Sequence, residues 1–333
     1  MMNKTSLKIA HEADDREAMD AALRTRLPAW TRRIPNRLNA AILALQIVAI
    51  FSCFRAAAVL SSTWALAALT CWFAVLMVGA YSIIHEAEHG VLFTNARANL
   101  AGGVIMAAFF PVPFHLLRQG HIGHHLRNRS DDEAFDLWFE GESPVWKWIQ
   151  WIGVLTGLFY LVIVVGNIVA LAIPFALKRR WFEFDRPSAA FMDALNPKYQ
   201  RVIQIEALGV IALHTLIVWL MRIPATRYLA LYGAFGALWS GMQYVHHYAT
   251  ERHITRGARN LWVWRPIDKL WLNHNWHRAH HEHPTVSWIH LEKLGGAAGD
   301  DRQFLPWVYL RMWLGPRKAT THVENRFAGK VIR

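Results

Sequence analysis

The stretch 64–84, WALAALTCWFAVLMVGAYSII, decides the fold, because it ends directly at the segment His85-Glu-Ala-Glu-His89. Its length matches the roughly 20 residues that a helix needs to cross the hydrocarbon core of a bilayer. In a helix, residues four positions apart lie on one face, so the imidazoles of His85 and His89 can reach a single site. The stretch therefore predicts a membrane-spanning helix that presents two imidazoles at one membrane surface.

A second apolar run, 38–60, precedes this stretch and is separated from it only by the polar residues 61–63. The two runs predict a tight transmembrane hairpin. By the positive-inside rule, the basic residues before the first run place that end of the hairpin in the cytoplasm. These residues are Arg24, Arg26, Arg32, Arg33 and Arg37. The hairpin therefore returns His85 to the cytoplasmic side of the membrane.

The runs 202–221 and 225–245 predict a second transmembrane hairpin, with residues 222–224 as its turn. Two crossings return the chain to the side from which it started, so His246 and His247 also lie on the cytoplasmic side. From residue 248 onward the chain is polar, aromatic and rich in histidine, and we expect it to form a cytoplasmic cap.

Two further apolar stretches do not fit simple spans. Pro111 and Pro113 interrupt the stretch 100–117. Such a break is tolerated at membrane depth only where protein or water satisfies the backbone, so we interpret the segment as shallow or re-entrant. The stretch 145–177 is too long for one span and too short for two, and we expect a re-entrant hairpin that turns near the Gly-Asn pair at 166–167.

The composition agrees with a membrane protein, since 54% of the 333 residues are hydrophobic and the mean hydropathy is +0.15. We predict an all-α integral membrane protein with two clear transmembrane helical hairpins, re-entrant or short membrane segments and a cytoplasmic histidine-rich cap. The chain divides into a cytoplasmic N-terminal segment, 1–37, a membrane domain with the histidine motifs, 38–294, and a cytoplasmic C-terminal tail, 295–333. Residues 1–30 lack the apolar core of a cleaved signal peptide and are interpreted as a cytoplasmic tail or a short surface helix.

A net charge of +12 and a pI near 10.0 raise the question of nucleic-acid binding. The basic residues do not form one recognition helix, and the chain between them is strongly apolar. The positive-inside rule explains the charge, so no nucleic-acid partner is expected. Cys53 and Cys71 both lie in apolar runs, which argues against a disulfide framework and against a thiolate metal site.

Two more histidine motifs follow the first, His121-Ile-Gly-His124-His125 and His277-Arg-Ala-His280-His281. Spacings of three and four residues let each motif present its imidazoles to a shared metal cluster. The three motifs offer eight imidazoles, whereas a tetrahedral zinc ion takes four ligands, so two metal ions fit better. Imidazole suits iron, copper, nickel and zinc alike, and the spacing does not choose among them.

The order of these motifs, HxxxH, then HxxHH, then HxxHH after the last span, resembles the membrane fatty acid desaturase family over residues 85–294. The polar, acidic segment 127–133 looks like the family's continuation of the second motif. The segment 243–247 is similar to the family's isolated histidine between the second and third motifs. The residues 283–288, HPTVSW, look like the bacterial versions of the third motif. The short first motif likewise favours bacterial desaturases, hydroxylases and ketolases.

The resemblance implies two non-haem iron ions, O2 as a co-substrate and no catalytic residue beyond the metal ligands. It implies a lipid or acyl substrate among the membrane lipids and a separate electron donor such as ferredoxin. The site would lie on the cytoplasmic face of the bacterial inner membrane. The implied ligands are His85, His89, His121, His124, His125, His247, His277, His280 and His281, with His246 as the alternative to His247.

The reaction implied by the resemblance is the O2-dependent introduction of a double bond into a fatty acyl chain or a related lipid. A hydroxylase or ketolase of a lipid or terpenoid on the same scaffold is the main alternative. A non-catalytic membrane metal-binding protein or transporter is a further one, although a transporter would place its ligands near the bilayer midplane. The histidine motifs lie instead at or beyond the predicted membrane exits.

The roles of several polar residues other than the motif histidines stay open at this point. Glu86 and Glu88 either orient the ligating imidazoles or are solvated. His214, inside an apolar run, is interpreted as a neutral histidine that is hydrogen-bonded to a neighbouring helix. Other histidines have the wrong spacing for the pattern and are interpreted as structural or as supports of the ligands: His115, His253, His274, His283 and His290.

Overall fold

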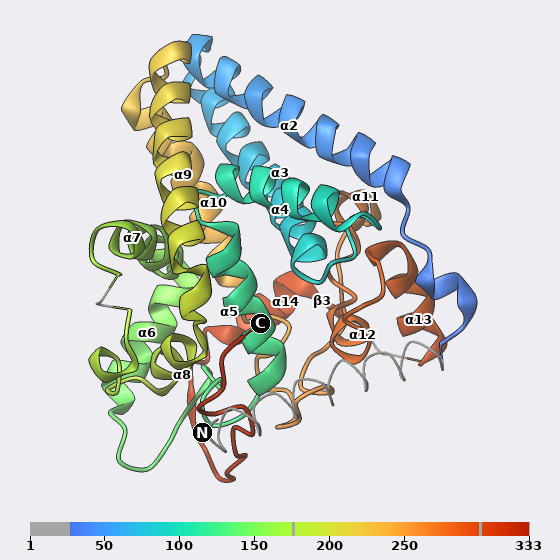
Figure 1. Ribbon diagram of the computed structural model, residues 1–333, viewed down its shortest axis with the longest axis vertical. Helices are drawn as coiled ribbons and strands as arrows, with labels where there is room; N and C mark the ends of the chain where they lie inside the picture. The colour runs from blue at the N-terminus through green and yellow to red at the C-terminus, as the bar shows by residue number, and fades with distance from the viewer. Residues whose placement is uncertain (1–26, 175–176, 300–301, 333) are drawn as a thin grey trace, which may run out of the picture.

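The computed structural model describes residues 27–174, 177–299 and 302–332, and these residues are mainly helical (Figure 1). The longer helices are α2 (Asn36–Val59), α3 (Thr63–Glu88), α4 (Ala96–Phe109), α5 (Phe114–Arg127), α6 (Pro144–Thr156), α7 (Leu158–Ala172), α9 (Gln200–Met221) and α10 (Ala225–Met242). The shorter helical elements are η1 (Ala29–Arg32), η3 (Arg179–Trp181), α8 (Arg186–Ala194), η4 (Pro197–Tyr199), α11 (Arg265–Leu270), α12 (His277–Glu282), η5 (Trp288–His290), α13 (Leu291–Ala297) and α14 (Leu305–Met312). In the same residues, short parallel strands pair as β1 (Leu137–Trp138) with β4 (Arg317–Lys318) and β2 (Leu261–Trp262) with β3 (Gln303–Phe304).

Helices α2 and α3 form the first predicted hairpin, and both are long and apolar enough to cross a membrane. Ser62 caps α3 by accepting a hydrogen bond from the backbone N–H of Ala65 at 3.4 Å. Every residue in the segment 76–88 at the end of α3 is buried, whereas α2 exposes most of its apolar side chains. The histidine-bearing end of α3 is therefore held inside the protein.

Helices α9 and α10 form a second hairpin, with Arg222 in the turn between them. The segment that contains α9 is long and apolar enough to span a membrane, whereas α10 is not among the described helices that meet both criteria. Instead α10 packs in the interior, where Leu231, Phe235 and Trp239 are buried. It ends at Met242, so the chain turns before it reaches the histidines that follow.

The two interrupted stretches are pairs of helices joined at sharp bends. Helices α4 and α5 meet at 101° beside Pro111 and Pro113, where the prolines predicted an interruption. Helices α6 and α7 meet at 91°. If each bent pair is counted as one span, the described residues contain up to five spans.

The predicted turn at Gly166 and Asn167 is wrong, because both residues lie inside α7. The chain bends instead at Gly157, whose φ is +99°. Glycine adopts this conformation at no steric cost, and a Cβ here would lie 2.8 Å from the Cα of Ala237 in α10. The close approach of a second helix therefore sets the turn, and the local sequence does not reveal it.

The C-terminal segment 295–333 contacts the membrane domain through α14. Leu305, Val308 and Met312 are buried in the main core, and the indole N–H of Trp151 in α6 donates to the carbonyl of Met312 at 2.8 Å. Most of the N-terminal segment 1–37, including nearly all of the predicted tail or surface helix at 1–30, lies outside the described residues.

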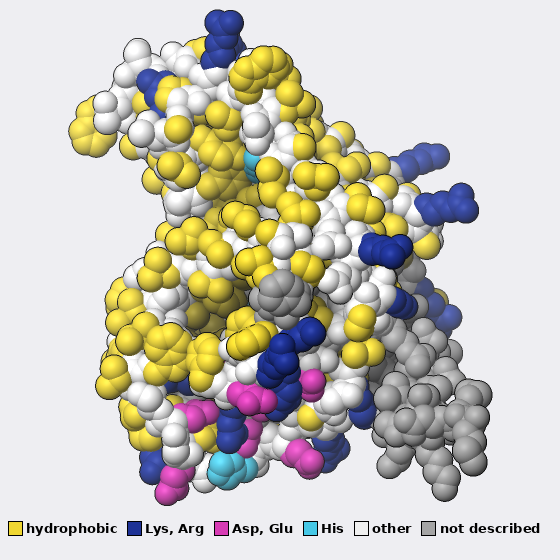
Figure 2. Space-filling view, turned by 60° about the vertical axis from the view of Figure 1, so that its left-hand side comes forward, with side chains coloured by type: hydrophobic (Ala, Val, Ile, Leu, Met, Phe, Trp, Pro, Cys, Tyr) yellow, Lys and Arg dark blue, Asp and Glu magenta, His cyan; other side chains and the backbone are white. Residues whose placement is uncertain are grey.

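Apolar side chains cover much of the outer surface. Figure 2 shows them over a large part of one face, with the acidic side chains of that face toward its lower end. Val48 in α2, Val162 in α7 and Trp219 in α9 are examples of such exposed residues. A large apolar surface is unusual for a soluble protein and fits contact with lipid. The prediction of an all-α integral membrane protein is confirmed by this surface together with the candidate spans.

Candidate metal centre

The nine histidines implied as ligands come together in two groups. The first histidine group contains His85, His89, His121, His125 and His280, and the second contains His124, His247, His277 and His281. Within each group every residue offers one ring nitrogen, and these nitrogens all lie within 4.8 Å of one another. Each group could therefore hold a metal ion.

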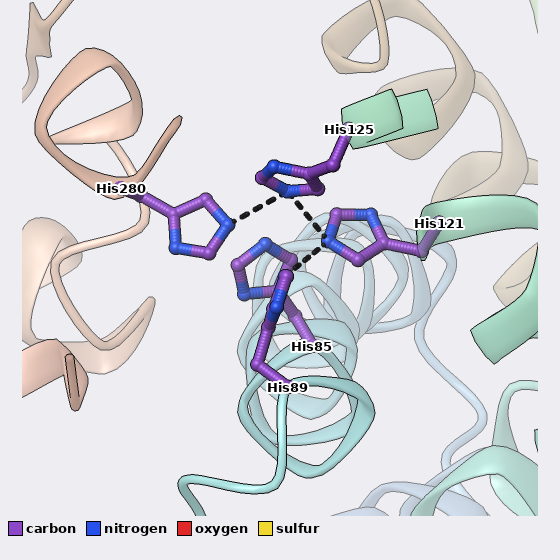
Figure 3. A group of neighbouring side chains, drawn as sticks. All are labelled: His85, His89, His121, His125 and His280. Carbon is purple, nitrogen blue, oxygen red and sulfur yellow. Dashed lines mark hydrogen bonds between the residues drawn. The ribbon is translucent and has the colours of Figure 1, made fainter. Parts of the chain in front are cut away.

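The first histidine group joins three helices, since α3 carries His85 and His89, α5 carries His121 and His125, and α12 carries His280. Figure 3 shows the rings of this group turned toward one another. The Nε2 atom of His121 lies 2.7 Å from that of His89 and 3.1 Å from that of His125. The Nε2 atom of His125 also lies 3.0 Å from that of His280.

These distances fit metal ligation better than a hydrogen-bonded cluster. A ring nitrogen carries either one proton or one lone pair, so His121 Nε2 and His125 Nε2 can each form only one good hydrogen bond. Each nevertheless has two nitrogen neighbours. The Nε2 atom of His85 is buried without a hydrogen-bond partner among the described residues. A cation at the centre would accept all of these lone pairs at once.

The second histidine group draws on α5, α12 and the turns after α10. The Nε2 atom of His277 lies 3.1 Å from that of His247 and 3.2 Å from that of His281. His124 joins the group from α5 and packs at right angles to the ring of His281. The same argument about shared nitrogens applies here, so this group also fits a cation.

Each HxxHH helix contributes to both groups. In α5, His121 and His125 belong to the first group and His124 to the second. In α12, His277 and His281 belong to the second group and His280 to the first. Residues four apart share a face, whereas the adjacent residue is turned by about 100° around the axis. The two helices therefore lie between the groups and supply both.

Contacts outside the groups orient two of these rings. Glu133 Oε1 lies 3.1 Å from His124 Nδ1, and Glu133 Oε2 accepts a hydrogen bond from Arg127 Nε at 2.7 Å. His247 Nδ1 lies 2.8 Å from the carbonyl oxygen of Gly257. A ring that donates through Nδ1 directs its Nε2 lone pair to a metal, which is how ligating histidines are commonly held. The sequence placed Glu133 in the polar, acidic segment after the second motif but assigned the residue no role.

The carboxylates of the first motif are not solvated, since Glu86 and Glu88 are only 2% and 1% exposed. Glu86 accepts hydrogen bonds from the Ser287 hydroxyl at 3.1 Å and from the backbone N–H of Trp288 at 3.0 Å. It thereby links the end of α3 to the segment after α12. Both carboxylate oxygens of Glu88 lack a hydrogen-bond partner among the described residues.

Burial favours the neutral form of the histidines in the histidine-rich segment that follows α10. Desolvation lowers the pKa of His247, His277, His280 and His281 well below the usual histidine range, and neighbouring imidazoles lower it further. Burial also lowers the pKa of His274 to about 4. Neutral imidazole is the form that binds metal, so these residues are prepared for ligation near neutral pH.

The structure separates His247 from His246, because only His247 lies in the second group. His246 instead forms a third cluster with His274 and His277. His115 lies apart from the groups, with its Nδ1 2.6 Å from Glu206 Oε1. His214 contacts the Tyr228 hydroxyl and the Ala108 carbonyl, as expected for a neutral histidine bonded to neighbouring helices.

A half-open cavity reaches the first group at His89. Its volume is about 210 Å³, and it lies where α4, α5 and the start of α9 approach one another. Leu100 and Phe114 contribute apolar surface, and Arg118 and Tyr199 contribute polar groups. This volume is smaller than the roughly 300–1,000 Å³ of typical ligand pockets, so the cavity can admit part of a lipid chain but not a whole lipid.

Comparison with known proteins identifies one family. The model of the fatty acid desaturase family matches residues 62–316, a range that contains all three histidine motifs and both HxxHH helices. No curated protein matches the sequence. The family match confirms the resemblance seen in the motifs, while the bacterial type stays a prediction.

Proposed function

The chain belongs to the fatty acid desaturase family and is an oxidoreductase of the desaturase and hydroxylase type, and we propose that it introduces a double bond into a fatty acyl chain or related lipid in an O2-dependent reaction at a di-iron centre. The observation that carries this proposal is the division of nine histidines into one group of five and one group of four. Two separate groups suit two metal ions rather than one. We propose all nine as the ligands.

When bound, two iron ions would supply the oxidising power needed to remove hydrogen from an unactivated methylene group. The residues of the chain present neutral nitrogen ligands, orient them and restrict water. Glu133 and the Gly257 carbonyl hold the rings of His124 and His247. The burial of the third motif keeps its imidazoles unprotonated and available for ligation.

We further propose that the substrate reaches the centre through the cavity beside His89. Its apolar lining residues, among them Leu100 and Phe114, suit a hydrocarbon chain. Its polar lining residues, among them Arg118 and Tyr199, suit the polar end of the same molecule. An amphiphile bound in this way would bring a methylene group toward His89.

The proposal places the centre on the cytoplasmic face, which would belong to the inner membrane of a bacterium. Support comes from the basic residues that border the candidate spans at 32–37 and 178–180. Electrons would come from a separate acidic carrier such as ferredoxin, which a net charge of +12 would attract. In this arrangement 38–294 forms the membrane domain, 1–37 precedes it, and 295–333 folds back on it.

A product assay tests the reaction. Purified, iron-loaded protein with a reducing system and O2 is incubated with candidate lipids, and the product mass is measured. A product that lacks two hydrogens supports desaturation, whereas a product with one added oxygen supports the alternative of a hydroxylase or ketolase on the same scaffold. A protein that binds two ions and yields no product with any lipid would favour the non-catalytic alternative.

We expect His280→Ala to lose iron from the first histidine group and with it product formation, because His280 is a member of that group. The matched control is His253→Ala, since His253 lies in the same cap and its exposed side chain hydrogen-bonds, within the described residues, only to its neighbours Thr255 and Arg256. Iron content and product are measured on both variants. Full iron and full activity in His280→Ala would contradict the proposed site.

A further inference from the structure

A third cluster of imidazoles lies beside the two groups. His246, His274 and His277 place one ring nitrogen each within 4.8 Å of the others. His277 also belongs to the second group, whereas His246 and His274 belong to neither the first nor the second. The ring centroids of His246 and His277 are 4.4 Å apart, and those of His274 and His277 are 5.1 Å apart.

His277 can face two sites because its ring has two nitrogens. Its Nε2 atom points into the second group, 3.1 Å from His247 Nε2 and 3.2 Å from His281 Nε2. Its Nδ1 atom is buried and has no hydrogen-bond partner among the described residues. The nitrogen on the other edge of the ring is therefore available to the third cluster.

Two more buried polar atoms in this region lack a partner within the described residues. One is Nε2 of His246, and the other is Oδ1 of Asn275. The amide nitrogen of Asn275 donates to Asp268 at 3.0 Å, so its oxygen faces a different direction. The side chain of Asn275 also lies close enough to His246 for a weak hydrogen bond, but the contact does not reach the geometry of a normal hydrogen bond, so both atoms stay without a good partner. Buried polar atoms in native proteins are nearly always paired, and several such atoms in one place indicate a missing ligand.

A hydrogen bond between His246 and His277 does not explain these atoms. Their rings are tilted by only 36° at a centroid distance of 4.4 Å, which places one ring partly over the face of the other. A nitrogen lone pair lies in the plane of its ring, so this arrangement is poor for a direct bond. A ligand between the edges of the rings would satisfy both.

We propose that His246, His274 and the Nδ1 edge of His277 form a third seat for a divalent transition-metal ion, with the amide oxygen of Asn275 within reach as a further ligand. Imidazole nitrogens with one neutral oxygen suit zinc or ferrous iron. When both His277 nitrogens bind ions, the ring loses its remaining proton to solvent and bridges the second group and the third seat. Loss of that proton is costly, so the third ion binds more weakly than the first two.

A metal titration of the full-length protein tests this seat. Metal-free protein in detergent is equilibrated with Zn²⁺ at buffered free concentrations, and bound zinc is counted by mass spectrometry. Zinc is the probe because it has no redox chemistry. We expect two ions to bind tightly and a third to bind at higher free zinc, with release of a proton.

Variants assign the third ion to its residues. We expect His246→Ala and His274→Ala to bind two tight ions and to lose the third, whereas the control His253→Ala binds all three. His246→Gln and His274→Gln keep a polar side chain of similar size and test whether misfolding causes the loss of the third ion. Two tightly bound ions retained in a variant show that its fold is intact. A wild-type protein that saturates at two ions would overturn the proposal, as would a third ion that persists in both alanine variants.

The result does not depend on the proposed reaction, because no turnover is measured. Loss of the third ion with normal product formation would leave the desaturase proposal standing. A third ion in a protein that yields no product would instead support the seat and contradict the reaction.

Discussion

Glu133 is a single residue that connects the second histidine group to the surrounding protein, through its contacts with His124 and Arg127. Burial by itself would raise the pKa of Glu133, but the charge of Arg127 and the hydrogen bond with His124 lower it overall, so the carboxylate is ionised near neutral pH. An ionised acceptor keeps the proton of His124 on Nδ1. The carboxylate thus orients the ring of His124. The sequence motif shows only that a histidine is present at this position.

We expect Glu133→Gln to weaken metal binding in the second group by about 10- to 100-fold, the range typical for a lost partner of a ligating histidine. The first group should keep its affinity. A Zn²⁺ titration against a competing chelator separates the two tightly bound ions, one in each histidine group. Glu140→Gln is the control because Glu140 is exposed, and it should bind like the wild type. Equal weakening in the two variants would mean that Glu133 has no specific role.

Among the secondary-structure elements, the ends of helices rather than their middles carry most of the histidines of the site. The last turn of α3 carries His85 and the residue that caps this helix is His89, while α5 and α12 carry the HxxHH motifs. The bend between α4 and α5 allows α5 to leave the direction of α4 by 101° and approach α12. The bent pairs are therefore part of how separated motifs meet.

The bend between α6 and α7 makes a testable prediction about glycine. We expect Gly157→Ala to destabilise the protein by about 1–3 kcal/mol through backbone strain at φ +99°. A clash with the Cα of Ala237, 2.8 Å from the new Cβ, adds to this cost. Thermal unfolding in detergent measures the change.

Gly166→Ala is the matched control, because Gly166 lies inside α7 and a Cβ there meets nothing within 4 Å. We expect no loss of stability and a gain of up to about 1 kcal/mol from the better helix propensity of alanine. If Gly166→Ala proved the more harmful change, the bend would lie at the position predicted from the sequence instead.

At the scale of the whole molecule, the buried histidines make stability depend on pH. The folded protein lowers the pKa of His247, His277, His280 and His281, whereas unfolded histidine has a pKa of about 6.5. Below that pH the unfolded chain binds more protons than the folded one. Stability is therefore fully present above the unfolded pKa and is lost as the pH falls below it.

We expect the Tm of metal-free protein to fall between about pH 7.5 and about pH 5.5, with each such histidine contributing about 1.4 kcal/mol per pH unit below its unfolded pKa. Zinc-loaded protein should keep its Tm to lower pH and then lose it together with the metal, because protons and metal compete for the same nitrogens. Differential scanning fluorimetry of both forms measures this. A constant Tm in the metal-free form would show that the histidines are not held neutral by burial.

The sequence by itself determined the membrane character and the three histidine motifs, and it predicted that their eight imidazoles fit two metal ions better than one. These features depend on local rules, because apolar length decides a span and residues four apart share a helix face. It also indicated the hairpins at 61–63 and 222–224, where short polar or proline-containing links interrupt apolar runs. The match to the fatty acid desaturase family covers residues 62–316, which include all three motifs.

Only the tertiary structure decided how the histidines are shared. His124 lies in the second group although its motif neighbours His121 and His125 lie in the first, and His280 lies in the first group although His277 and His281 lie in the second. His247, and not His246, belongs to the second group. The bend at Gly157 likewise depends on α10, which is distant in sequence. Adjacent residues on a helix point about 100° apart. Long-range packing places each HxxHH helix between the two groups, and this placement decides which ring faces which group.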